Sequence, residues 1–106
     1  MIKTDVRIPK NLSNEIINLC QVIKVKKTNF MALAIEWMIK EESLILEEKY
    51  LIKRGKVGYI TKDARFQFYI EEEQAETIER IALQYQVKPA IIYWYALEKY
   101  VDYMKG

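Results

Sequence analysis

The chain repeats one pattern of residues at a fixed spacing of 62 positions, without a gap. This offset places Thr4, Val6 and Ile8 on Phe66, Phe68 and Ile70. It also places Ile16, Leu19, Cys20 and Ile23 on Ile78, Ile81, Ala82 and Tyr85. Self-similarity of this kind marks a repeated supersecondary unit. A unit of one strand and two helices is too small to bury its own apolar faces, so we expect the two copies to share one core.

Both copies open with alternating polar and apolar residues, the period of a strand that has one buried face. In the first copy this stretch covers residues 3–9, and Pro9 ends the pairing because it lacks a backbone donor. A strand this short needs a partner. We expect residues 65–72 of the second copy to pair with it as an antiparallel ribbon. The exposed face of the ribbon would carry Lys3, Asp5, Arg7, Arg65, Gln67 and Tyr69.

Each strand is followed by two stretches of helical period. The first helix covers residues 12–23, with Asn11 or Ser13 able to cap it, and the second begins near Lys27 or Thr28. The inward side chains of that second helix are predicted to be Phe30, Leu33, Ala34, Trp37 and Met38. In the second copy, residues 72–85 form one helix, with Ile78, Ile81, Ala82 and Tyr85 inward. The last helix begins at Pro89, a residue favoured in the first helical position, and carries Ile92, Tyr95, Ala96 and Tyr100 on one face.

The pattern divides the chain into a first copy at residues 1–42, a connector at 43–64 and a second copy at 65–106, around one shared core. The apolar stripe of the second helix either continues to Ile52 or breaks near Ser43, and the sequence leaves both open. The connector carries a basic patch that either contacts an anionic partner or is a solvated helix end: Lys49, Lys53, Arg54 and Lys56. The last helix has more aromatic residues than one core stripe needs, so Trp94 and Tyr103 are candidates for a chain-to-chain interface.

Composition bounds the chemistry of the chain. It has 106 residues, of which 51% are hydrophobic and 30% charged, so it is expected to fold. It has no histidine, which excludes a histidine metal site and a histidine-dependent triad, and the single Cys20 has no internal disulfide partner. The alternating N-terminus is unlike a signal peptide, and the longest apolar run is too short to span a bilayer. We therefore expect a soluble cytoplasmic protein that is not an enzyme, with no cofactor, no metal, no small-molecule substrate and no membrane partner.

The order of the elements resembles the ribbon-helix-helix (Arc/MetJ) superfamily of DNA-binding proteins. The resemblance is carried by residues 4–9, by the spacing from Ile8 to the inter-helix turn at Lys24, and by residues 30–37. Residues 34–36 and 96–100 are also similar to the second helix of small plasmid copy-number repressors in that superfamily. The resemblance implies a mainly α fold with a two-stranded antiparallel ribbon, in which one chain carries both halves of the family dimer. The sequence departs from the family at the inter-helix turn, where Lys24 and Gln86 stand in place of the common glycine.

The resemblance also implies which residues contact double-stranded DNA. In the family, the outward ribbon residues read base edges in the major groove, which here are Lys3, Asp5, Arg7, Arg65, Gln67 and Tyr69. The N-terminus of the second helix binds a phosphate, through free N–H groups and the helix dipole. The residues at that position in the two copies are Lys24, Lys26, Lys27, Thr28, Asn29 and Lys88.

The charges of the two copies differ in sign. The first copy and the connector each carry +2 and the second copy −2, which together give the net charge of +2. We expect a sequence-specific DNA-binding protein, either a transcriptional repressor or a plasmid-transfer accessory factor of plasmid or phage type, whose chains associate on DNA. The alternative is a protein-interaction module that has the same fold and does not bind DNA, because the second copy is acidic and the last helix is rich in aromatic residues.

Overall fold

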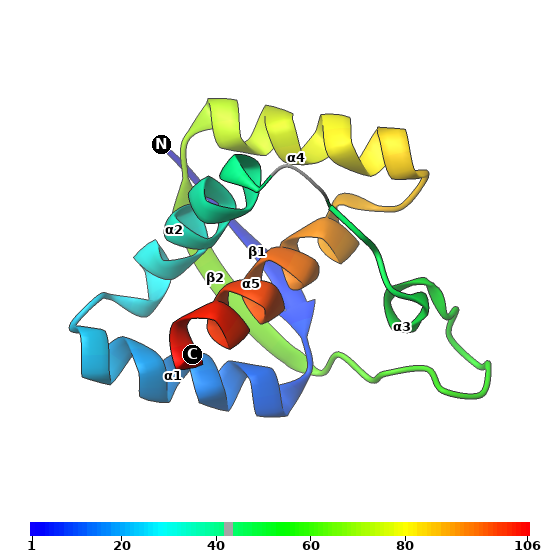
Figure 1. Cartoon of the computed structure of the whole chain (residues 1–106), viewed down its shortest axis with the longest axis horizontal. Coiled ribbons are helices and arrows are strands. Elements are labelled where there is room, and N and C mark those ends of the chain that lie inside the picture. Colours follow the sequence, from blue (N-terminus) through cyan, green and yellow to red (C-terminus); the bar gives the residue numbers. More distant parts are fainter. Residues whose placement is uncertain (42–43) are drawn as a thin grey trace.

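Two strands of seven residues, far apart in the sequence, pair to form the only sheet among the described residues: β1 (Ile2–Ile8) and β2 (Ala64–Ile70). The computed structural model describes residues 1–41 and 44–106. Its other elements are helices, so the fold is mainly α with a two-stranded antiparallel sheet (Figure 1). The helices are α1 (Lys10–Ile23), α2 (Lys27–Lys40), α3 (Glu48–Leu51), α4 (Glu72–Tyr85) and α5 (Pro89–Lys105).

The strand register is symmetric about a central pair. At the centre, Asp5 lies opposite Gln67, the residue that corresponds to it in the second copy. On either side of this pair, Lys3 lies opposite Tyr69, the counterpart of Arg7, and Arg7 lies opposite Arg65, the counterpart of Lys3. The bounds of β1 and α1, moved by 62 residues, coincide with those of β2 and α4, and the start of α2 coincides with the start of α5. The predicted antiparallel ribbon is therefore confirmed.

The turns inside both copies use the same backbone conformation. Lys24 ends α1 at φ 58° and Gln86 ends α4 at φ 57°, both in the left-handed region. This conformation lets the chain reverse direction after a helix, and glycine adopts it most easily. Side chains at these two positions therefore strain the backbone.

Replacing Gln86 with glycine is expected to raise the free energy of unfolding by about 0.5–1 kcal/mol. The relief of left-handed strain, about 1–2 kcal/mol, exceeds the extra entropy that glycine loses on folding. The matched control is Gln84→Gly, an exposed residue inside α4, which is expected to cost about 1 kcal/mol instead. Urea unfolding of the two variants measures the difference, and a loss of stability in both would contradict this reading of the turn.

The core lies between the inner face of the ribbon and the helices that cover it. In Figure 1, α2 and α5 lie across the ribbon, with α4 along one side and α1 along the other. The ribbon contributes Phe66 and Phe68 to one buried cluster, which also contains Phe30 of α2 and Tyr93 of α5. Aromatic side chains of this size bury a large apolar area each, so this shared cluster stabilises both copies together.

Several details of the predicted helices are wrong. Neither Asn11 nor Ser13 caps α1, since the helix begins at Lys10, two or four residues earlier than those caps require, and Pro9 is its N-cap. Leu33 is 36% exposed, whereas its counterpart Tyr95 is 8% exposed. Trp94, a candidate for a chain-to-chain interface, is buried. The difference arises because the connector covers α5 and leaves the equivalent side of α2 open.

The connector does not prolong α2. That helix ends at Lys40, with Glu41 in extended conformation, and residues 44–47 have no regular structure. The predicted alternative of a break near Ser43 falls outside the described residues. After the single turn of α3, the chain passes through turns around Gly55 and Gly58 to reach β2.

Candidate nucleic-acid interface

The outer face of the ribbon carries the six side chains that the alternation predicts. Lys3, Asp5 and Arg7 are exposed on β1, while the residues between them face inward. On β2, Arg65 and Gln67 are exposed and Tyr69 is half-buried. Successive side chains of a strand point to opposite faces, and each outward residue here lies opposite another outward residue. The six side chains therefore form one continuous surface: Lys3, Asp5, Arg7, Arg65, Gln67 and Tyr69.

Charge is unevenly distributed along this outer face. The guanidinium groups of Arg7 and Arg65 stand at one end, and Lys3 with Tyr69 stand at the other. Asp5 in the centre accepts hydrogen bonds from Arg65, with 2.8 Å from Nε and 2.7 Å from the terminal nitrogen to the same carboxylate oxygen. Because both partners are exposed, this ion pair adds little stability. A competing hydrogen-bond partner can therefore displace it at small cost.

The remaining side chains of the face make weaker contacts. The Lys3 ammonium lies 5.9 Å from the centroid of the Tyr69 ring. Arg7 donates to the backbone carbonyl of Asp63 at 3.3 Å, just before β2 begins. These contacts hold long side chains over the ribbon and leave further donors of each cation free. Lysine and arginine donors suit guanine O6 and N7, and the Gln67 amide suits the edge of adenine.

The N-terminus of α2 lies beside the ribbon and is rich in cations. Lys26 is its N-cap, and no side chain caps the helix. The Lys27 ammonium lies 5.3 Å from the ring centroid of Phe66 on β2, which places this end of the helix next to the strand. Of the predicted phosphate-binding residues here, Lys24, Lys26 and Asn29 are exposed, and Lys27 and Thr28 are half-buried. Uncapped N–H groups together with lysines favour an anion.

The N-terminus of α5 has the same backbone arrangement with fewer cations of its own. Lys88 is its exposed N-cap and Pro89 follows in the first turn, again without a side-chain cap. By contrast, a capping box already occupies the N-terminus of α4, where the Glu71 and Gln74 side chains bond to the backbone. The carboxylate of Glu71 supplies the negative charge that the helix dipole favours. The acidic run at the start of α4 thus has a local structural role.

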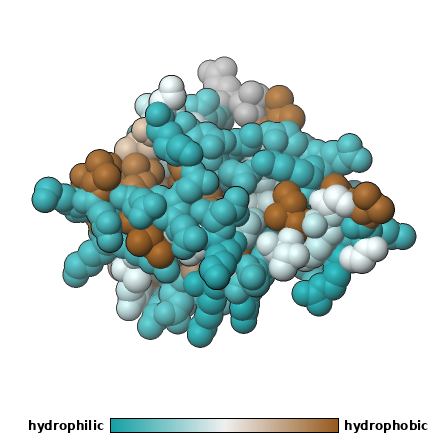
Figure 2. Space-filling view, turned by 90° about the horizontal axis from the view of Figure 1, so that it is seen from below, coloured by the Kyte–Doolittle hydropathy of each residue, from teal (hydrophilic) through white to brown (hydrophobic). Residues whose placement is uncertain are grey.

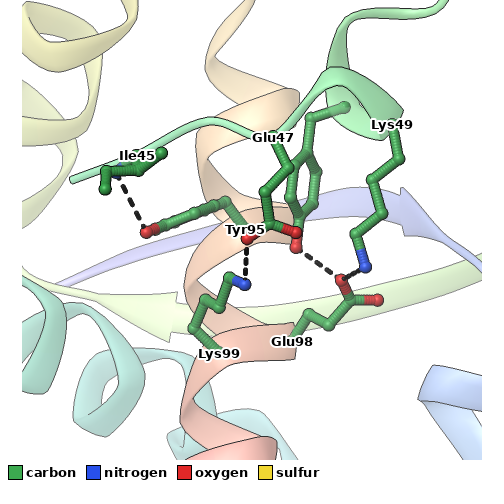
Figure 3. Close-up of polar contacts among 7 residues, drawn as sticks. Ile45, Glu47, Lys49, Tyr95, Glu98 and Lys99 are labelled. Carbon is green, nitrogen blue, oxygen red and sulfur yellow. Dashed lines mark hydrogen bonds and ion pairs between the residues drawn. The ribbon is translucent and has the colours of Figure 1, made fainter.

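Polar contacts that the sequence pattern did not reveal hold the connector against α5, where Figure 3 shows them, and against the end of α4. The buried Tyr50 ring packs edge-on against Trp94 and its hydroxyl donates to Glu98, which also pairs with Lys49 at 2.5 Å. Glu47 pairs with Lys99. The backbone N–H of Ile45 donates to the Tyr95 hydroxyl at 3.4 Å, and the Tyr85 hydroxyl donates to the carbonyl of Leu44 at 2.8 Å. The partners are 41 to 52 residues apart, so no local spacing signals them.

Replacing Tyr50 with phenylalanine is expected to reduce the loss of stability at alkaline pH. Burial first, and then the hydrogen bond to Glu98, raise the pKa of Tyr50 far above its ordinary value of 10. A raised folded-state pKa gives stability that is present below pH 10 and is lost as the pH rises beyond it. Urea unfolding between pH 8 and pH 11 should show a shallower decline for Tyr50→Phe than for the wild type. Tyr103→Phe, at an exposed tyrosine, should follow the wild-type decline, and the same result for Tyr50→Phe would contradict the assignment.

The described residues contain no group of three or more histidine, cysteine, aspartate or glutamate side chains placed to hold a metal ion. In the same part of the chain, no helix is both long and apolar enough to cross a bilayer. No protein-family model, curated protein or solved structure matches this chain.

Proposed function

We propose that the chain is a sequence-specific double-stranded DNA-binding protein that reads the major groove with the outer face of its ribbon. The observation that carries this proposal is the continuous row of six outward side chains, centred on the Asp5–Gln67 pair. A two-stranded ribbon has the width to enter the major groove, where its outward residues reach base edges. The assigned base contacts are Lys3, Asp5, Arg7, Arg65, Gln67 and Tyr69.

We further propose that the fold is a tandem ribbon-helix-helix arrangement, in which one chain supplies both halves of a pseudo-dimer. Its support is the symmetric register together with the shared offset of 62 residues in strands, helices and left-handed turns. Each half then offers one uncapped helix N-terminus to a phosphate, as in P-loops and other anion sites. The assigned phosphate contacts are Lys24, Lys26, Lys27, Thr28, Asn29 and Lys88.

The two half-ribbons carry different residues, so the proposed target is an asymmetric sequence. Lys3 on β1 corresponds to Arg65 on β2, and Arg7 corresponds to Tyr69. A repressor or a plasmid-transfer accessory factor, with two or more chains side by side on one site, fits such a target. A single ribbon of seven residues per strand contacts only a short DNA sequence. Two or more chains bound side by side would contact a longer one.

Selection from a random-sequence duplex pool, followed by fluorescence anisotropy across salt concentrations, tests this function. The expected result is an enriched motif bound more tightly than the unselected pool, with affinity that falls as salt increases. The absence of salt-dependent binding at micromolar protein would refute it.

The second candidate is a protein-interaction module without DNA binding. The observation that favours it is the Arg65–Asp5 ion pair, because these two of the six outward side chains already bind each other and so are less available to DNA bases. The side of the molecule seen in Figure 2 is mostly hydrophilic, and the hydrophobic residues on it lie in separate groups, so this side does not favour it. A protein interface normally centres on one buried apolar cluster. The selection experiment above separates the two candidates.

A further inference from the structure

A cavity of about 790 Å³ opens between the connector and the turn that leads into α5. Four basic side chains line it and no acidic one does: Lys53, Arg54, Lys62 and Lys88. Among the described residues, none of these four forms an ion pair with a carboxylate. Their positive charges repel one another, and an anion bound between them would relieve that repulsion.

A tyrosine hydroxyl lies among these cations. The Lys62 ammonium is 4.3 Å from the ring centroid of Tyr59, and hydrogen bonding to Lys62, followed by that to Arg54, lowers the pKa of the exposed hydroxyl. Lys62 also lies 4.8 Å from the ring centroid of the buried Trp94, which fixes the lysine stem against α5. Part of the cationic cavity is thus held in place, because Lys62 packs against two aromatic rings.

The basic residues around the cavity lie where the second copy has fewer cations than the first copy. The turn of the first copy carries Lys24, Lys26 and Lys27, whose counterparts in the second copy are Gln86, Lys88 and Pro89. Two cations are therefore missing at the start of α5. The connector brings three to the same place: Lys53, Arg54 and Lys62.

We propose that Arg54, Lys62 and Lys88 bind a phosphate group of the DNA backbone on the α5 side of the ribbon. This inference rests on the proposed DNA-binding function. Lys62 precedes Arg65 by three residues, which is about 10 Å of extended chain, so the cavity continues the cationic end of the ribbon. The connector then does more than link the copies, since it restores the phosphate contact that the turn residues Gln86 and Pro89 cannot make.

The test measures the salt dependence of binding to a mixed-sequence 30-base-pair duplex by fluorescence anisotropy. The double variant Arg54→Ala/Lys62→Gln keeps most of the Lys62 stem and removes both charges. Because one phosphate contact is lost, it is expected to lower the slope of log affinity against log salt by about 1 and to weaken binding roughly 8-fold at 0.1 M salt. Arg54→Lys/Lys62→Arg should restore the wild-type slope.

The matched control is Lys40→Ala/Lys56→Ala, which removes the same charge from exposed positions outside the cavity. Equal slopes for the two double variants would overturn the proposal while leaving DNA binding intact. Saturable binding of inorganic pyrophosphate by the wild type, with an unchanged DNA slope in Arg54→Ala/Lys62→Gln, would assign the cavity to a small anion and also overturn it. Failure of the wild type to bind the duplex would overturn both this inference and the proposed function.

Discussion

Replacing Arg7 with alanine is expected to reduce affinity for the selected DNA sequence by about 5- to 150-fold and to relax the preference at one base pair. Arg7 stands outward on β1 beside Arg65, and a bidentate contact from such a side chain to guanine contributes about 1–3 kcal/mol of discrimination. Competition anisotropy with duplexes changed at one base pair at a time measures the effect.

The matched comparison is Lys26→Ala, which removes a cation from the N-cap of α2. Its affinity should fall by a similar factor for every sequence, with a salt slope lower by about 1 and an unchanged base preference. Lys40→Ala, at the far end of the same helix, should change neither quantity. Equal relaxation of base preference by Arg7→Ala and Lys26→Ala would contradict the division between base-reading ribbon and phosphate-binding helix.

Replacing Phe66 with alanine is expected to lower the free energy of unfolding by about 3–5 kcal/mol. Phe66 is fully buried on the inner face of β2, and removing its ring loses both the transfer free energy and the packing around the resulting cavity. Because the ribbon joins the two copies, the wild type and the variant should each unfold in a single transition. Urea unfolding followed by circular dichroism and tryptophan fluorescence measures both quantities.

The control for this variant is Leu83→Ala, since Leu83 is 80% exposed on α4. A surface change of this kind usually alters stability by less than about 0.5 kcal/mol. Two separate transitions, or a loss in Phe66→Ala no larger than in Leu83→Ala, would show that the copies do not depend on a common core.

The ribbon and the four long helices follow from the sequence because they obey the strand and helix periods and occur twice. In the structure, α2 begins at Lys27, α5 begins at Pro89 and α4 spans residues 72–85, as the spacing predicts. Periodicity identifies apolar residues but does not show what covers them. Leu33 and Trp94 are both wrongly assigned for that reason, since the covering segment is the connector, which has no second copy to compare.

The arrangement of the candidate site depends on contacts between distant residues. The alternation predicts that Asp5 and Arg65 share a face, but only the register shows that they meet. Likewise, the basic residues of the connector divide into different roles. Lys49 pairs with Glu98, whereas Lys53 and Arg54 line the cavity beside α5 together with Lys62. A charge run cannot reveal this division, because it depends on how the chain folds back.

Nuclear magnetic resonance distinguishes the outer face of the ribbon from every other surface of the protein as the place where DNA binds. Amide resonances of isotopically labelled protein would be followed during titration with the selected duplex. We expect the largest shifts on residues 2–8 and 64–70 and at the first turns of α2 and α5. Shifts concentrated instead on the exposed sides of α1 and α4, with the strand residues unchanged, would contradict that expectation.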